Sequence, residues 1–245
     1  NGLLYGLTSN GGTSSAGSLF SITITPTPPG TQLVFSPQPS SGPDGALAHF
    51  TATLEDTTGA VSTTNNSRVT IKIASGPSGA KISGTLSANA VNGVATFTKV
   101  SLPAAGTYTL QATDPSLTSA TSDPFTLNPS APTHLVFVQQ PLTTAAGTAV
   151  APALTVFVED KFNNVVTTDS STVTLSLSSK PAGGALANGQ LSVTAANGIA
   201  TFTGLIFDVA GSYTLLASDD SLSSTKSKSF AVTADLSTQS LVLLQ

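Results

Sequence analysis

The sequence predicts an all-β protein built of two tandem Greek-key β-sandwiches. The prediction rests on an internal duplication and on apolar residues that alternate with polar ones at a period of two in both copies. A chain of 245 residues also has the length of two sandwiches of about 100 residues each. No segment shows the 3.6-residue period of an amphipathic helix.

The duplication consists of four segments that return in the same order. They are, each with its partner, residues 31–35 (TQLVF) and 133–137 (THLVF), Glu55-Asp56 and Glu159-Asp160, residues 92–98 (NGVATFT) and 197–203 (NGIATFT), and residues 105–110 (AGTYTL) and 210–215 (AGSYTL). The two downstream pairs share one spacing of 105 residues. The repeats therefore define one domain over residues 31–129 and a second over residues 130–234.

The strands are predicted from alternation and the turns from their residue types. Phe50, Ala52 and Leu54 alternate with His49, Thr51 and Thr53, which places the first three in a core and the others on the outer face. The pairs at 92–93 and 197–198 are Asn-Gly, which favours type I′ hairpin turns because both residues tolerate positive φ. Gly59 and Asn163, which follow the acidic pairs, suit a left-handed conformation for the same reason.

Tyr108 and Tyr213 specify the kind of sandwich. Each follows an Ala-Gly-Thr/Ser turn and stands two residues before an apolar core position, Leu110 or Leu215. This is the spacing of the tyrosine corner in immunoglobulin-type sandwiches, where the hydroxyl group bonds back to the backbone. We therefore predict two immunoglobulin-like domains in which both tyrosines are structural.

These segments resemble the bacterial immunoglobulin-like repeats of invasin- and intimin-type surface proteins. The resemblance is carried by the acidic turn at 159–165 with the Val-Thr strand at 173–175, by the Asn-Gly-x-Ala-Thr-Phe strand, and by the Ala-Gly-x-Tyr strand. It covers residues 31–129 and 131–233. It implies an extracellular or cell-surface stalk or spacer, and it brings no catalytic residues, because such domains share no active site.

Two segments lie outside the repeats. Residues 1–30 form a glycine-rich segment with a strand at Leu19, Phe20, Ile22 and Ile24 and a proline-rich linker, and residues 235–245 hold an orphan strand at Leu241, Val242, Leu243 and Leu244. We expect both terminal strands to be unpaired. They are either edges of a longer array or assembly strands, by which a filament subunit adds a strand to its neighbour. Proline-rich linkers at 25–30 and 128–132 are semi-rigid, so we expect the domains to form a rod.

Composition excludes several classes of function. Charged residues are 8% of the chain and the net charge is −4, with no basic stripe, so we expect no nucleic-acid partner. The absence of cysteine removes disulfides and thiolate metal sites. No apolar run approaches the ~18 residues of a membrane span, so we expect no membrane insertion.

Candidate chemical sites are few. Glu55, Asp56, Glu159 and Asp160 could offer oxygen ligands to calcium, together with Asp114, Asp219 and Asp220, but adjacent acids in turns usually cap backbone donors. Asn65 begins a glycosylation sequon, His49 and His134 are expected on the surface, and Lys72 lies on the polar side of its strand, away from an isopeptide position. No enzyme motif is present, so we predict a protein that is not an enzyme and needs no cofactor.

The sequence therefore predicts an extracellular structural protein, a subunit or segment of a surface stalk or filament. Its partners would be copies of itself or neighbouring domains of the same protein. The alternative is an adhesin that binds a glycan or protein ligand through the end loops of the sandwiches, and exposed aromatic residues in those loops would favour it.

Overall fold

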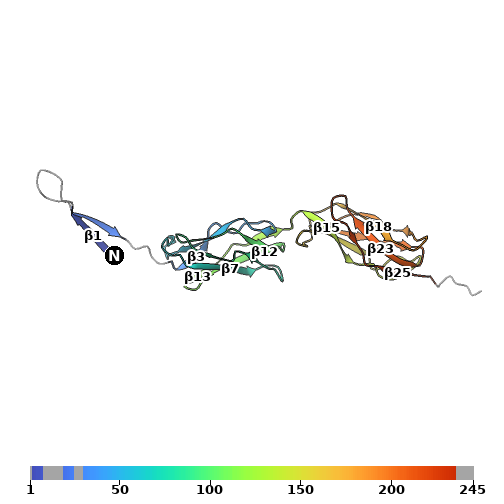
Figure 1. The fold of residues 1–245 in the computed structure, drawn as a ribbon, viewed down its shortest axis with the longest axis horizontal. Coiled ribbons are helices and arrows are strands. Elements are labelled where there is room, and N and C mark those ends of the chain that lie inside the picture. Colours follow the sequence, from blue (N-terminus) through green and yellow to red (C-terminus); the bar gives the residue numbers. More distant parts are fainter. Residues whose placement is uncertain (1, 8–18, 25–29, 236–245) are drawn as a thin grey trace, which may run out of the picture. The chain divides into compact units, whose positions relative to one another are not determined.

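The computed structural model describes residues 2–7, 19–24 and 30–235, and all regular secondary structure in this part of the chain is β. Contacts divide the chain into two compact units (Figure 1). The first comprises Asn1–Ser41, Ala46–Leu102 and Thr107–Thr126. The second comprises Gly42–Gly45, Pro103–Gly106 and Leu127–Gln245. Two short segments of the first sequence repeat thus belong by their contacts to the second unit.

The N-terminal strand is paired, so its prediction as an unpaired strand is wrong. β1 (Gly2–Leu7) and β2 (Leu19–Ile24) form an antiparallel two-stranded sheet with Gly2 opposite Ile24 and Leu7 opposite Leu19. The chain itself supplies a partner for the ladder groups of Leu19, Phe20, Ile22 and Ile24. The other predicted assembly strand, at Leu241–Leu244, lies outside the described residues.

In the first unit, the repeat begins with three antiparallel strands. β3 (Gln32–Phe35) pairs with β6 (Phe50–Glu55), which pairs with β10 (Val94–Phe97). A second series of antiparallel strands begins with β9 (Ser87–Asn89), which pairs with β7 (Arg68–Ser75). β7 pairs in turn with β12 (Gly106–Asp114), and β12 pairs with β13 (Leu117–Thr121). β13 meets β3 in parallel at Thr118 and Gln32. Phe50 and Phe97, both fully buried, stack with ring centroids 5.4 Å apart in the core of this unit.

Short strands complete the first repeat. β5 (Gly45–Ala46), β11 (Val100–Leu102) and β8 (Ser83–Gly84) form a small sheet. β4 (Gly42–Pro43) pairs in parallel with β14 (Phe125–Asn128), the last strand of the repeat.

The second repeat has the same plan. One sheet holds β15 (Pro132–Gln139), β17 (Leu154–Asp160) and β21 (Ile199–Phe202). The other holds, in spatial order, β16 (Thr144–Ala145), β25 (Phe230–Thr233), β23 (Gly211–Ser218), β18 (Thr172–Ser179) and β20 (Ser192–Thr194), with β24 (Thr225–Lys226) also on β23. β19 (Leu186–Asn188) and β22 (Ile206–Phe207) form a separate pair. β16 runs parallel to β25, whereas the other pairs of neighbouring strands in this sheet are antiparallel.

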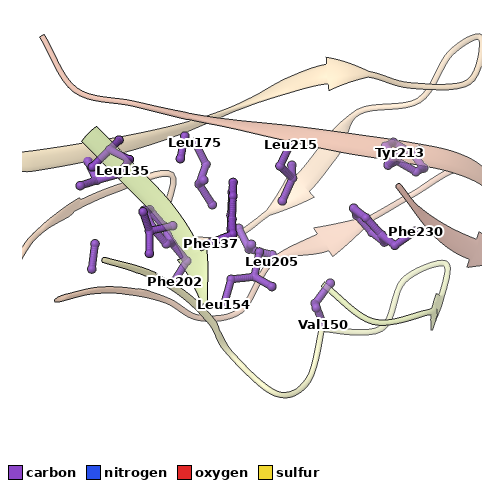
Figure 2. Close-up of a cluster of buried hydrophobic side chains, with 14 of the residues drawn as sticks. Leu135, Phe137, Val150, Leu154, Leu175, Phe202, Leu205, Tyr213, Leu215 and Phe230 are labelled. Atoms are coloured by element: carbon purple, nitrogen blue, oxygen red, sulfur yellow. The ribbon is translucent and has the colours of Figure 1, made fainter. Parts of the chain in front are cut away.

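Both sheets of the second unit contribute to one core (Figure 2). Leu135 and Leu154 come from one sheet, and Leu175 and Leu215 come from the other. At one end of the core Phe207 lies 4.6 Å from the ring of Tyr213 and 5.2 Å from that of Phe230. Burying both inner faces against each other is the arrangement that the alternation of residues predicts.

The predicted turn conformations are confirmed. Asn92 and Asn197 have φ of 51° and 53°, and Gly59 and Asn163 have φ of 83° and 67°. Gly198 allows a close approach as well as a positive φ, because a Cβ there would lie 2.5 Å from the carbonyl oxygen of Val166.

The prediction that Thr51 and Thr53 face outwards is wrong. Both are buried, with exposed fractions of 8% and 7%. Their hydroxyl groups donate to carbonyl oxygens near the neighbouring strand, Thr51 to Ser36 and Thr53 to Val34 at 3.1 Å. A hydroxyl that bonds locally to the backbone can be covered at little cost, and simple alternation does not register this.

Candidate functional site

The most distinctive polar group of the described chain is built around Asp160, at the end of β17 in the second unit. Its side chain is fully buried. Oδ1 accepts the backbone N–H groups of Phe162 at 2.8 Å and Asn164 at 3.0 Å, which closes the turn that Asn163 makes possible with its positive φ. Oδ2 accepts the N–H of Ser130 at 3.0 Å and its hydroxyl at 3.2 Å.

Asn164 connects Asp160 with the two segments that the first repeat contributes to this unit. Its Nδ2 donates to Oδ2 of Asp44 at 2.5 Å and to the carbonyl oxygen of Pro103 at 2.8 Å. The same nitrogen lies 3.4 and 3.3 Å from Oδ1 and Oδ2 of Asp160. Its Oδ1 accepts the N–H of Ala105 at 3.0 Å. One amide nitrogen is thus surrounded by four oxygen atoms, three of which belong to carboxylates.

Asp44 completes this group, and only one of its two carboxylate oxygens has a hydrogen-bond partner. It is 5% exposed, and its Oδ1 is buried without a hydrogen-bond partner. Burial and the neighbouring Asp160 raise the pKa of Asp44 to about 6, against smaller opposing effects of Ser130 and Asn164. Burial also raises the pKa of Asp160, but hydrogen bonds from Asp44 and from backbone N–H groups outweigh it and bring that pKa to about 2. Two buried carboxyl groups therefore compete for few donors.

The equivalent turn of the first repeat has the cap but lacks the rest of the group. Oδ1 of Asp56 accepts the N–H of Thr58 at 2.8 Å, the Thr58 hydroxyl at 2.6 Å and the N–H of Ala60 at 3.0 Å. These bonds lower the pKa of Asp56, the Thr58 hydroxyl most strongly. Ala60 stands where the second repeat has Asn164, so no side-chain amide is available there.

The four predicted calcium candidates are divided between the units. Glu55 accepts the hydroxyl of Thr53 at 2.9 Å beside Asp56, and Glu159 lies next to Asp160 with its carboxylate 3.5 Å from the ring of His134. Burial raises the pKa of Glu159, His134 lowers it and Asp160 raises it, and the net direction is upward. Within residues 2–7, 19–24 and 30–235, no three or more His, Cys, Asp or Glu side chains converge as a metal site.

Other acidic residues act as local caps. In Asp114 and Asp219, Oδ1 accepts the N–H and hydroxyl of the serine two positions later, at 2.8 and 2.9 Å for Ser116 and at 3.0 and 3.1 Å for Ser221. This is the Asx-turn arrangement by which aspartate stabilises a tight turn. His49 and Lys72 are exposed.

Tyr108 and Tyr213 are fully buried. The Tyr213 hydroxyl donates to the carbonyl oxygen of Val209 at 2.8 Å, four residues upstream on the other side of the Ala-Gly turn. Asn65 of the predicted sequon is half-buried, and its Oδ1 accepts the N–H of Ser67 at 3.0 Å. Its glycosylation stays a prediction.

Two buried serines that were not predicted from the sequence hold equivalent positions in the two repeats. Ser122 and Ser227 are 105 positions apart, and their hydroxyls accept the N–H groups of Leu110 and Leu215 at 2.9 and 3.0 Å. Each hydroxyl also donates to the next carbonyl along the chain, both at 2.9 Å. The equal spacing is the sequence signal that could have identified them.

Comparison with known proteins gives structural likeness only. No family model and no curated protein sequence matches the chain. The D00-D0 domain of intimin aligns with a TM-score of 0.44 and 14% identity, and the D0-D1 domain of intimin with 0.31 and 19%. They cover 82% and 83% of this chain, and 98% of each intimin fragment. Invasin, described as a bacterial integrin-binding protein, aligns at 0.33 and 14%, over 83% of this chain and 39% of its own.

A β-glycosidase from Bacteroides vulgatus is also found, at a TM-score of 0.38 and 14% identity, over 82% of this chain and 24% of that chain. The described chain is all-β and of the immunoglobulin-like sandwich class that the sequence predicts. Intimin and invasin, whose repeats the sequence resembles, are among the solved structures found. At these identities and TM-scores, the role of the chain has to be argued from its own residues. In the described part of the chain no helix is long and apolar enough to cross a membrane.

Proposed function

We propose that the chain is a tension-bearing spacer, a segment or subunit of an extracellular stalk or filament at the cell surface. The observation that carries this proposal is a parallel pair that joins the second strand of each repeat to its last strand. In the second repeat, β16 lies beside β25 with Thr144 opposite Val232 and Ala145 opposite Thr233. In the first, β4 lies beside β14 with Gly42 opposite Leu127 and Pro43 opposite Asn128.

The hydrogen bonds of the two pairs are equivalent. The N–H of Ala146 donates to the carbonyl oxygen of Thr233 at 2.9 Å, and the N–H of Asp44 donates to that of Asn128 at 2.8 Å. Thr233 also donates its hydroxyl to the carbonyl of Thr144 at 3.3 Å. Each of these parallel pairs, β4 with β14 and β16 with β25, is called a strand clamp below. Because both repeats have one, the clamp is part of the repeated plan of the chain.

Parallel pairing decides how a pulling force is distributed. When tension acts on the two ends of a repeat, the two strands of its parallel pair, β4 and β14 or β16 and β25, are drawn in opposite directions along their common axis. All hydrogen bonds of the pair are then loaded together, whereas an antiparallel hairpin pulled at its open end loses them one at a time. A domain with such a clamp keeps its length under load, which is the property that a stalk or filament requires.

Force spectroscopy on the full chain, held at both ends, tests this proposal. We expect two unfolding events, each releasing roughly 350 Å of chain for about 100 residues. Ala146→Pro removes the clamp N–H of the second repeat and should shift one of the two events to lower force. Ala146→Ser keeps the N–H and should leave both events unchanged. Equal forces for all three proteins would refute the load-bearing role.

Assembly and location need separate experiments. Electron microscopy of the purified chain, with intact-mass measurement, should show filaments if strand donation joins the subunits, and monodisperse particles would restrict the role to a spacer. Proteolysis of intact cells should remove the protein if it lies at the surface. Protection equal to that of a cytosolic control would contradict that location.

A further inference from the structure

The group formed by Asp44, Asp160, Asn164 and Pro103 places four acceptor oxygens around one amide nitrogen, which carries only two hydrogens to donate. All four residues belong to the second unit. The oxygens of Asp44, Pro103 and Asp160 lie 2.5 to 3.4 Å from one point, the Nδ2 atom of Asn164. Calcium takes carboxylate, amide and backbone carbonyl oxygens at 2.3–2.6 Å. The Asp44 oxygen already lies at such a distance from that point and the Pro103 oxygen slightly beyond it, whereas the two Asp160 oxygens, at 3.4 and 3.3 Å, would have to move closer by about 0.8 Å.

A second observation indicates missing positive charge. Oδ1 of Asp44 is buried with no partner, in a side chain that is 95% covered. A buried carboxylate oxygen without a donor is costly, and native structures normally pair it with hydrogen bonds, an opposite charge or a metal ion. No lysine or arginine forms an ion pair with Asp44 or Asp160 among the described contacts, so their charges are balanced only by hydrogen-bond donors.

We propose that this group is a calcium site, in which Asp44, Asp160 and the carbonyl oxygen of Pro103 bind the ion and Asn164 turns its Oδ1 towards it. Water molecules complete the six to eight ligands that calcium prefers. Magnesium is disfavoured, because it requires a near-ideal octahedron at shorter distances and gives up water reluctantly.

The number of charges sets the expected affinity. Two carboxylates, one amide and one carbonyl are a modest ligand set, comparable with extracellular modules that bind calcium with Kd of about 10⁻⁴ to 10⁻³ M. Asp44 is shared with the parallel strand pair of the first repeat, where its backbone N–H donates to Asn128. The proposed site uses its carboxylate instead, so it does not depend on the proposed load-bearing role. It also explains why the acidic turn of the first repeat is different, since Asp56 has Ala60 where a ligand would be needed.

The test is the thermal unfolding of the full chain after chelation, with and without 10 mM CaCl₂, at an ionic strength matched with NaCl and with MgCl₂ as a second control. Binding at the expected affinity should raise the midpoint of one transition by several degrees, and calorimetric titration should give the Kd above. Asp44→Asn should abolish the calcium-dependent rise. Asp56→Asn, which removes one carboxylate charge from the acidic turn of the first repeat, should retain it.

Asn164→Asp provides a variant in the opposite direction. A third carboxylate should lower the midpoint in chelator by repulsion, and should tighten calcium binding by about tenfold because affinity rises with ligand charge. The proposal is overturned by a wild-type chain that does not respond to calcium, by an equal response to magnesium, or by a response that Asp44→Asn leaves intact.

Discussion

The substitution Ser227→Ala tests whether the buried hydroxyl of Ser227 is needed for the stability of the second repeat. The hydroxyl of Ser227 is the acceptor for the N–H of Leu215, at 3.0 Å, in the middle of β23. Leu215 is fully buried and Ser227 is 6% exposed, so water has little access to the amide that the change leaves unpaired.

The expected cost follows from this burial. An unsatisfied buried donor costs roughly 1–3 kcal/mol, and we take about 2 kcal/mol for Ser227→Ala. A loss of about 2 kcal/mol changes the folding equilibrium about 30-fold and lowers the midpoint of a 100-residue domain by roughly 8–16 °C. Ser229→Ala is the matched control, because the exposed Ser229 hydroxyl only exchanges a hydrogen bond with Ser212 at 2.8 Å. That change should stay within about 0.5 kcal/mol.

The assay is thermal and urea unfolding of the full chain, with hydrogen exchange to localise the effect. Exchange at the Leu215 amide should accelerate about 30-fold in Ser227→Ala and remain unchanged in Ser229→Ala. The first repeat provides a replicate, because Ser122→Ala should do the same to Leu110, whose N–H lies 2.9 Å from the Ser122 hydroxyl. If Ser227→Ala were no more destabilising than Ser229→Ala, the hydroxyl could not be a required acceptor.

Three further predictions concern a turn, an acidic cap and the core. Gly198→Ala should cost roughly 2–4 kcal/mol, because the new Cβ would lie 2.5 Å from a carbonyl oxygen at φ +74°. Gly183→Ala, at φ +77° with open space around it, should cost only about 1–2 kcal/mol, and equal urea midpoints would contradict the close contact. The lowered pKa of Asp56 stabilises the fold above its unfolded pKa near 3.8 and loses this effect as the pH falls further, so Asp56→Asn should flatten the acid limb of the stability–pH curve. An unchanged limb would show that another group titrates there. Phe207→Leu should destabilise the second unit by about 1–2 kcal/mol, through loss of the ring contacts at 4.6 and 5.2 Å, and a change below about 0.5 kcal/mol in urea unfolding would count against these contacts.

The class of fold and much of its local geometry follow from the sequence alone. Alternation at a period of two identifies a strand face because successive side chains point to opposite sides, and Val69 and Ile71 are indeed buried while Thr70 and Lys72 are exposed. The Asn-Gly turns were predictable for an equally local reason, since positive φ is a property of the residue and its neighbours.

The candidate site was predictable only in part. Asp160 was among the acidic residues singled out, and its role as a turn cap depends on residues 162 and 164 beside it. Asp44 and Pro103 could not be found in this way, because they precede Asn164 by 120 and 61 positions and meet it only through the fold.

Tertiary structure also decided which polar groups were buried. Thr51, Thr53 and Ser227 are of polar residue types that usually lie on a surface. Each is buried here because a particular backbone group lies within hydrogen-bonding distance of its hydroxyl. The partner of Leu19–Ile24 was decided in the same way, since a strand's neighbour depends on the path of the chain. Periodicity reports how one segment is divided between water and core, whereas pairing between distant segments depends on the closure of the whole fold, which has no local signature.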